Sequence, residues 1–189
     1  MELSKAFSTV EIRDMAISVV AIALIFSFPN VAQFPMLLVA VIIAFLFHEL
    51  AHKFVAQRFG AVAYYKMWPH LLLLGLVAML TPFKFVAPGA VVIQPYKFGR
   101  WGYRFKHLSP NELGLIAVSG ILVNLFFALT LRLVENPIAQ TIALLNAWLA
   151  FFNLIPLGPL DGRKVLRWSM FAWFVLILIS FLLVISSFI

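Results

Sequence analysis

Cysteine is absent from the 189 residues of this chain, and charged residues are scarce. The absence of cysteine excludes disulfides and thiolate metal ligands, so any zinc site must be built from histidine and carboxylate. Only 11% of the residues are charged whereas 64% are hydrophobic, and a soluble domain would carry about twice that share of charge. The composition therefore predicts an integral membrane protein whose surroundings are the lipid bilayer.

Acidic residues are also few, since 7 aspartates and glutamates face 14 lysines and arginines and leave a net charge of +7. No module that interleaves basic and aromatic residues accompanies this excess, so nucleic acid is not expected as a partner. In a membrane protein, an excess of basic residues instead indicates which loops face the cytoplasm.

Several apolar stretches are long enough to cross a bilayer, and five spans are expected. They are Ile12–Phe28, Pro35–Ala56, Gly114–Val134, Ile138–Ile155 and Trp168–Ile189. A sixth stretch, Leu71–Phe83, has only 13 residues before Lys84 and is short for a span. The expected fold class is an all-α polytopic membrane protein of about five transmembrane helices, with a re-entrant β-like element after the second. We expect a single domain, residues 1–189, with its core at 35–167.

The re-entrant element is expected at about residues 71–95, entering the membrane and returning on the same side. Val91, Val92 and Ile93 favour extended backbone, and the residues before and after them break helices. The helix breakers are Pro82, Pro88, Gly89 and Pro95. Irregular backbone at membrane depth is tolerated against protein or a wet cavity, which suits the rim of an active site. An ordinary amphiphilic cytoplasmic loop is the alternative.

With this topology, nearly all basic residues fall on or near one face of the membrane. Arg132 alone falls on the opposite face, while the other opposite loop, residues 29–34, is uncharged. The positive-inside rule then places the N-terminus in the cytoplasm and predicts a multi-pass protein of the cell membrane. The residues on the cytoplasmic face are Lys5, Arg13, Lys53, Arg58, Lys66, Lys84, Lys97, Arg100, Arg104, Lys106, Arg163, Lys164 and Arg167.

A metal-binding motif lies inside the second predicted span, where His48 and His52 are four positions apart. On a helix these histidines lie on one face and could hold one zinc ion, with Glu49 beside them as general base. Ionisable groups at membrane depth are costly and mark function by default. The alternative for Glu49 is an i,i+4 ion pair with Lys53.

A catalytic zinc site usually has three protein ligands, so a third must come from elsewhere in the chain. Asp161 follows a turn rich in proline and glycine at the end of the fourth span, on the same side of the membrane. Alone, it would read as the N-cap of the last helix; beside a motif that lacks one ligand, it is the expected third ligand. The other acidic residues lie in the N-terminal segment, the basic loop or the far side: Glu2, Glu11, Asp14, Glu112 and Glu135.

Three asparagines lie within the predicted spans, where such groups often bond across helices. Asn146 and Asn153 are two turns apart on one face. Asn153 precedes the aspartate turn and is the expected contact for substrate backbone or for orienting a ligand. His70 and His107 are expected at the membrane interface rather than at the metal.

Taken together, these segments resemble the site-2 protease family of intramembrane zinc metalloproteases. The resemblance rests on His48–His52 in a membrane helix and on Asn153…Pro156…Asp161-Gly162 downstream. Ser119–Asn124 resembles the small-residue and asparagine segment found between these motifs, and residues 88–93 resemble the family's membrane-inserted β element.

The resemblance implies that His48, His52 and Asp161 ligate one zinc ion per chain and that Glu49 is the general base. It also implies an intramembrane endopeptidase that hydrolyses peptide bonds in or near transmembrane segments of membrane-anchored proteins. Asn124 would orient a ligand or bind substrate, and Val91, Val92 and Ile93 would hold an unwound transmembrane protein substrate as an added strand. The zinc site would open towards the cytoplasm. A metal-ion transporter or a catalytically silent relative is the alternative.

Overall fold

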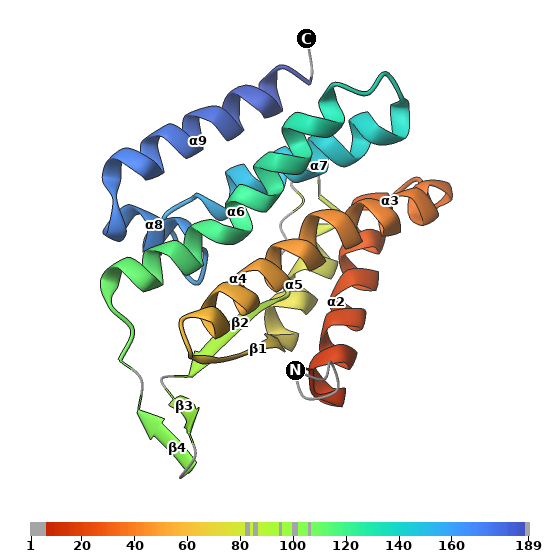
Figure 1. Ribbon diagram of the computed structural model, residues 1–189. Helices are drawn as coiled ribbons and strands as arrows, with labels where there is room; N and C mark the ends of the chain where they lie inside the picture. Colours follow the sequence, from red (N-terminus) through yellow and green to blue (C-terminus); the bar gives the residue numbers. More distant parts are fainter. Residues whose placement is uncertain are drawn as a thin grey trace.

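The computed structural model describes residues 7–81, 84, 87–94, 96–99, 102–105 and 107–187 (Figure 1). Parts of the predicted re-entrant element, residues 82, 83, 85, 86 and 95, lie outside this description. So do Lys5, Arg100 and Lys106, which contribute to the predicted charge asymmetry, and Glu2.

Two long helical segments form the first half of the fold. Helix α2 (Thr9–Ser27) begins at Ser8, whose side chain accepts a hydrogen bond from the backbone N–H of Glu11. The next segment runs from Val31 to Arg58 over 28 residues. It consists of η1 (Val31–Gln33), α3 (Phe34–Val41), the π-helical η2 (Ile42–Leu46) and α4 (Phe47–Arg58).

The second half is a group of helices packed around α6 (Pro110–Arg132), which contacts α4 and α7 (Pro137–Asn153) along its length (Figure 1). A capping box between Ser109 and Glu112 fixes the start of α6. Short α8 (Gly162–Trp168) and longer α9 (Met170–Ile185) follow α7 and complete this layer.

Two small antiparallel sheets accompany the helices, so the expectation of an all-α fold is corrected to a mostly helical one. Strand β1 (Val62–Met67) pairs with β2 (Gly89–Gln94) in a register that places Tyr65 opposite Val91. Helix α5 (Pro69–Ala78) lies between them in sequence. Strands β3 (Tyr96–Gly99) and β4 (Gly102–Phe105) form a separate hairpin. The prediction of extended backbone at Val91–Ile93 is confirmed.

Two described helices are long and apolar enough to cross a membrane, Val31–Arg58 and Pro110–Arg132. The expected set of five spans is therefore not reproduced by helix length and composition. Helix α2 has 19 residues but carries Glu11, Arg13 and Asp14 in its first turns, while α7 and α9 have 17 and 16 residues. The last predicted span, Trp168–Ile189, corresponds to a helix that begins two residues later, because α8 ends at Trp168 and α9 begins at Met170.

The two larger apolar clusters among the described residues hold most of these elements together. Ile22, Phe45, Tyr65 and Leu145 join α2, η2, β1 and α7 in one cluster. The second joins α6 with the residues on either side of the aspartate turn and includes Ile121, Leu154 and Val165. Tyr65 is buried, and burial raises the pKa of its hydroxyl. The first cluster therefore packs the sheet against α2 and the π-helical segment.

Candidate metal centre

The π-helical turn η2 directly precedes the metal-binding motif in the same continuous helix. A π turn changes which residues face a neighbouring helix, and such turns are frequent at functional sites. After it, α4 presents His48 and His52 towards α6, and both side chains are buried. The predicted one-face placement of the two histidines is present in the structure.

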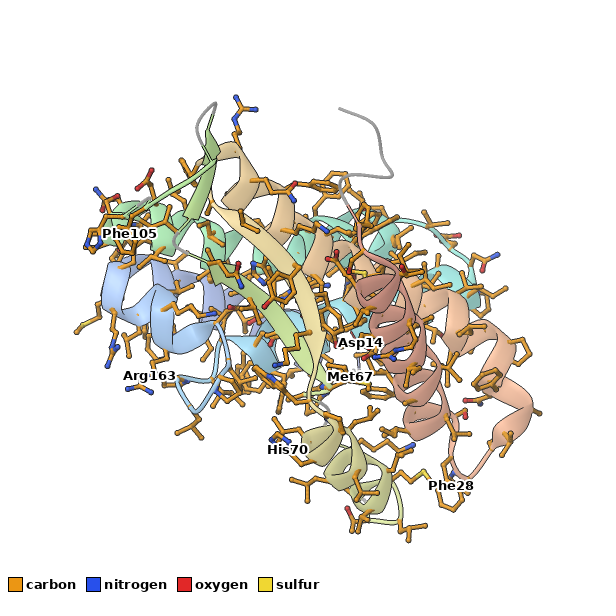
Figure 2. The ribbon with its side chains drawn as sticks, turned by 90° about the horizontal axis from the view of Figure 1, so that it is seen from below. Asp14, Phe28, Met67, His70, Phe105 and Arg163 are labelled. Carbon is orange, nitrogen blue, oxygen red and sulfur yellow. The ribbon has the colours of Figure 1, made fainter. Side chains whose placement is uncertain are left out.

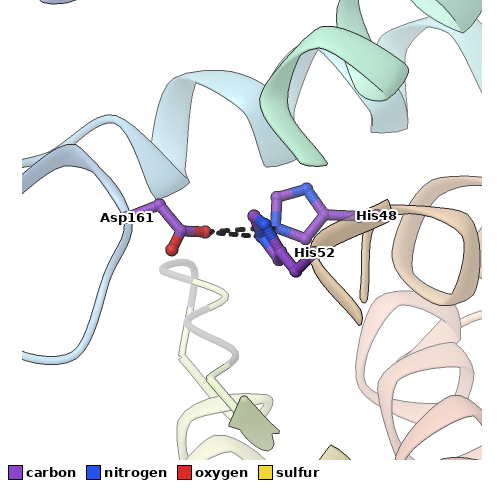
Figure 3. A group of neighbouring side chains, drawn as sticks. All are labelled: His48, His52 and Asp161. Atoms are coloured by element: carbon purple, nitrogen blue, oxygen red, sulfur yellow. Dashed lines mark hydrogen bonds and ion pairs between the residues drawn. The ribbon is translucent and has the colours of Figure 1, made fainter. Parts of the chain in front are cut away.

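Asp161 reaches the same point from the turn between α7 and α8. The turn passes close to itself at Gly162, where a Cβ atom would lie 2.1 Å from the carbonyl oxygen of Leu154. Asp161 occupies the N-cap position of α8, yet its side chain makes no capping hydrogen bond. The carboxylate instead faces the histidines (Figure 3), so the alternative of a simple helix cap does not describe it.

The three side chains converge closely, with their ligand atoms all within 4.8 Å of one another. Asp161 Oδ2 lies 2.9 Å from His52 Nε2 and 3.4 Å from His48 Nε2, and the two Nε2 atoms are 2.9 Å apart. All three residues are buried, with 2% to 8% of their surface exposed. Such a group could hold one metal ion.

The hydrogen bonds of Nδ1 in His48 and His52 explain why a cation fits among the three ligand side chains. His52 Nδ1–H donates to the carbonyl oxygen of Ile116 at 2.7 Å, because a carbonyl can only accept. His48 Nδ1 lies 2.6 Å from Asn124 Oδ1. Zinc is bound by the neutral form of imidazole; with Nδ1 donating, each ring directs the lone pair of Nε2 at the same point, where the carboxylate adds a third acceptor. Three facing acceptors repel unless a cation lies among them, and two imidazoles with one carboxylate suit zinc.

Asn124 holds His48 through a buried chain of hydrogen bonds. Its amide nitrogen donates to the carbonyl oxygen of Ala44 in η2 at 2.7 Å and to Asn146 Oδ1 at 2.9 Å, which leaves its oxygen to accept from His48. Asn146 in turn donates to the carbonyl oxygen of Ile142. The two asparagines thus connect the π turn, α6 and α7 to the metal-binding histidine.

Asn153 was expected to contact substrate backbone or to orient a ligand, and the structure places it in the lining of the cavity. Its amide nitrogen donates to the carbonyl oxygen of Leu149 in its own helix at 3.0 Å. The residue lines the cavity in front of Glu49 and Asp161, so its side chain faces the space that a substrate would enter. The ligand-orienting contact belongs to Asn124 instead.

Glu49 lies beside the ligand group and is 7% exposed. Its Oε2 accepts a hydrogen bond from the backbone N–H of Val91 in β2 at 3.1 Å. The alternative partner, Lys53, pairs with Glu11 at 2.6 Å instead. The carboxylate of Glu49 is therefore directed into the cavity that the three ligands, Val91 and Asn153 line.

Lys164 makes an ion pair with the other oxygen of Asp161, Nζ to Oδ1 at 3.0 Å. This contact leaves Oδ2 towards the histidines and fixes the rotation of the carboxylate. His70 and His107 are exposed and lie outside the ligand group, and their expected position at the membrane interface stays a prediction. Asn146 bonds across helices to Asn124, as its place in an apolar helix led us to expect. Sequence reasoning missed the contacts of Lys164 and Glu11, although a polar residue within an apolar helix is a usable signal at Glu11.

The chain is similar in sequence to proteins that are named as zinc metalloproteases. The chain is 41% identical over 179 residues, 88% of both chains, to the protein named "Putative zinc metalloprotease MJ0611" of Methanocaldococcus jannaschii. It is 31% identical over 157 residues to "Putative zinc metalloprotease YwhC" of Bacillus subtilis, covering 70% of this chain and 68% of that one.

A third relative is longer. "Zinc metalloprotease MJ0392" of Methanocaldococcus jannaschii is 30% identical over 132 residues, which are 69% of this chain and 33% of that protein. No family model and no solved structure matches the chain. Zinc is the cofactor that these relatives and the histidine–aspartate group indicate together. The two relatives matched over more than two thirds of their length place the chain in their family, so it belongs to the zinc metalloprotease family that their names describe.

Proposed function

We propose that this protein is a zinc-dependent endopeptidase that cuts membrane-anchored proteins in or near their transmembrane segments. The observation that carries the proposal is the position of the site. His48, Glu49 and His52 lie within the Val31–Arg58 helix, one of the two long apolar helices of the described chain. A protease whose ligands lie on such a helix meets its substrate where membrane segments are, not in bulk water.

The residues proposed to hold zinc are His48, His52 and Asp161, with one ion per chain. Bound there, zinc supplies a Lewis acid that acidifies a water molecule and polarises the scissile carbonyl. Asn124, Ile116 and Lys164 keep the three ligands oriented through the hydrogen bonds that they make. Because the three ligand atoms lie within 4.8 Å of one another, small shifts of these side chains would bring them to the spacing of a tetrahedral zinc site.

Glu49 is the proposed proton carrier. Its carboxylate faces the cavity in front of the ligands, so it can accept a proton from the attacking water and deliver it to the leaving amine nitrogen. The N–H of Val91 holds one carboxylate oxygen and leaves the other for the water. The strand and the acid–base group are thereby placed side by side.

The outer edge of β2, formed by Val91, Val92 and Ile93, is the proposed substrate-binding edge. A helical substrate hides its carbonyl groups and must unwind before hydrolysis, and an unwound segment can pair with a free strand edge. In antiparallel pairs, backbone N–H groups point alternately towards the partner and away from it. The N–H of Val91 points to Glu49 and away from β1, and that of Ile93 takes the same direction two residues later.

The proposed location is the cell membrane, with several spans and the N-terminus in the cytoplasm. The N-terminal end of α2, the β3–β4 hairpin and α8 lie towards the bottom and left of Figure 1. The α6–α7 loop and α3 lie towards the upper right. This arrangement supports five spans formed by α2, residues 31–58, α6, α7 and α9, with residues 71–95 re-entering from the cytoplasmic side and the zinc site opening there.

The test uses Glu49→Gln, which removes the proton carrier and leaves the three ligands untouched. Reconstituted protein is mixed with single-span substrates, the products are mapped by mass spectrometry, and zinc is measured in the same samples. We expect kcat to fall by about a hundredfold or more with zinc retained, because positioned acid–base catalysis contributes on that scale. Cleavage at the wild-type rate would contradict the proposed role of Glu49. Zinc flux into vesicles that survives the substitution would favour a transporter.

A further inference from the structure

The buried carboxylate of Glu11 lies outside the proposed zinc site but contacts two of the elements that build it. Glu11 is 2% exposed and Lys53 is fully buried. Both oxygens of Glu11 accept from Lys53 Nζ, at 2.6 and 2.7 Å, and Oε1 also accepts from the backbone N–H of Tyr65 at 2.8 Å. One carboxylate from α2 therefore holds helix α4 and strand β1 together.

Other polar residues on the same face of α2 hold the same strand. Asp14 Oδ2 accepts from the backbone N–H of Met67 at 3.3 Å, and Ser18 Oγ lies 2.9 Å from the hydroxyl of Tyr65. Positions 11, 14 and 18 are spaced three and four residues apart, which places them on one side of a helix. Figure 2 shows Asp14 beside Met67, where α2 crosses the strand. The outer edge of β1 is thus fixed by side chains of α2.

The two edges of the sheet carry equivalent contacts at the same pair of residues. Tyr65 and Val91 are directly opposite in the β1–β2 register. Their N–H groups point away from each other, that of Tyr65 to Glu11 and that of Val91 to Glu49. This is the geometry of a non-hydrogen-bonded antiparallel pair. The two-stranded sheet is therefore held between two glutamates, one on each edge.

Helix α4 links the contacts of Glu11 to those of Glu49, because it carries both Glu49 and, one turn later, Lys53. Glu11 fixes the position of α4 through Lys53 and the position of the sheet through Tyr65. The separation between Glu49 and the N–H of Val91 depends on both positions. A buried ion pair often adds little stability compared with apolar residues of similar volume, so stability alone gives little reason for charge here.

We propose that Glu11 is a positioning residue for the reaction: its carboxylate sets β1, and through β1 the edge of β2, against the helix that carries Glu49. The inference rests on the proposed function for its catalytic readout. Glu11 itself touches neither the ligands nor the cavity. Its effect is carried by the hydrogen bond to the backbone N–H of Tyr65, while the ion pair with Lys53 neutralises the buried carboxylate.

Two matched double variants separate the hydrogen bond from the charge. Glu11→Gln with Lys53→Met keeps an acceptor for the N–H of Tyr65, whereas Glu11→Met with Lys53→Met has the same length and no acceptor. Neither carries a buried charge, so their folding is comparable. A third variant, Glu11→Lys with Lys53→Glu, keeps an ion pair but offers the strand no acceptor at position 11.

We expect the glutamine variant to keep kcat within about threefold, and the methionine and swapped variants to lose about tenfold or more, since small misplacements cost rate on that scale. KM and zinc content should change little, and the amides of Tyr65 and Val91 should exchange with deuterium faster in the last two variants. Equal kcat in the glutamine and methionine variants, or full activity in the swapped variant, would overturn the proposal.

Hydrogen exchange keeps this test separate from the proposed function. If the wild-type chain cleaves no substrate while zinc is bound, the proposed function fails, but exchange at Tyr65 and Val91 still reports whether Glu11 sets the sheet. Unchanged exchange in the methionine variant would then overturn the inference independently.

Discussion

At the scale of single residues, Gly120 decides how closely α6 can approach the metal-binding helix. A Cβ atom at this position would lie 2.6 Å from His52 Nε2 and 2.8 Å from His48 Cε1. Both rings are buried and held from behind by Asn124 and Ile116, so neither can turn away without losing a hydrogen bond. The absence of a side chain at Gly120 is therefore a requirement of the ligand geometry.

We expect Gly120→Ala to lower the bound zinc well below one ion per chain and to reduce proteolysis in proportion. The added methyl group forces at least one imidazole out of position, and misoriented ligands typically cost about tenfold to a hundredfold in metal affinity. Metal content of the purified protein, measured by mass spectrometry, checks this result.

Gly158→Ala is the matched control for that substitution. Gly158 has φ +52° and no atom within 4 Å of the position of an added Cβ, so the change strains an exposed turn without touching the histidines. Asp161→Ala removes a proposed ligand, so its zinc content shows how much metal remains bound when the site is disrupted. Full zinc occupancy in Gly120→Ala would show that the two rings can adapt and that the close approach is not required.

The local parts of the site were predictable from sequence because spacing alone determines them. His48, Glu49 and His52 share one helix turn, and the pairing with Asp161 followed from the small number of acidic residues. The choice between Asn124 and Asn153 was not predictable in this way. It depends on how α6 crosses α4 near Gly120 and on the carbonyl of Ala44 in the π turn, and neither is encoded by local periodicity.

At the scale of elements, one strand was predicted and its partner was not. Extended backbone at Val91–Ile93 followed from β-branched residues after helix breakers. Strand β1, residues Val62–Met67, pairs with a segment more than twenty positions away, and it is held on its other edge by Glu11 and Asp14 of α2. Such a strand is stabilised by tertiary contacts, so the short sequence itself gives only a weak signal.

The free edge of β2 leads to a prediction that uses proline as a probe. We expect Ile93→Pro to lower kcat/KM for transmembrane substrates about tenfold, because it removes an outward N–H that would pair with substrate while the hydrogen bonds to β1 remain. Cleavage kinetics with a single-span substrate, together with the unfolding temperature, check this expectation.

Val92→Pro is the comparison for that variant, since the N–H of Val92 points towards β1 in this register. Proline there removes a hydrogen bond of the sheet itself and should lower the unfolding temperature more than Ile93→Pro does. If Ile93→Pro leaves kcat/KM unchanged for every substrate tested, pairing of substrate with this edge is refuted.

At the scale of the whole molecule, the charge distribution favours five spans, whereas the lengths of two helices are short for crossing a membrane. The basic residues favour one face for the N-terminus, the sheets and α8. Helices α7 and α9, with 17 and 16 residues, would reach only about 25 Å at 1.5 Å per residue. A hydrocarbon core of about 30 Å is slightly thicker, and local thinning of the bilayer at modest cost would allow both helices to cross it.

The lack of native cysteine allows this topology to be tested without background, since each introduced cysteine is the only thiol of the chain. Val31, Leu133, Leu157 and Arg163 are exposed and lie in or beside loops, so single cysteines there should react readily. With five spans and a re-entrant segment, a membrane-impermeant maleimide should label Val31→Cys and Leu133→Cys in intact cells. Leu157→Cys and Arg163→Cys should react only after the cells are permeabilised.

Ser186→Cys supplies the final constraint, because an odd number of spans places it opposite the cytoplasmic N-terminus. If residues 71–95 crossed the membrane completely, every later loop would change sides, so Leu157→Cys would react in intact cells and Leu133→Cys would not. Labelling of Val31→Cys is the same in both topologies and controls for access to the cell surface. The pair Leu133 and Leu157 thus separates a re-entrant element from a sixth span. A reversed pattern would place the turn of Asp161 on the opposite face of the membrane from the end of α4, which contradicts the close approach of the three ligands.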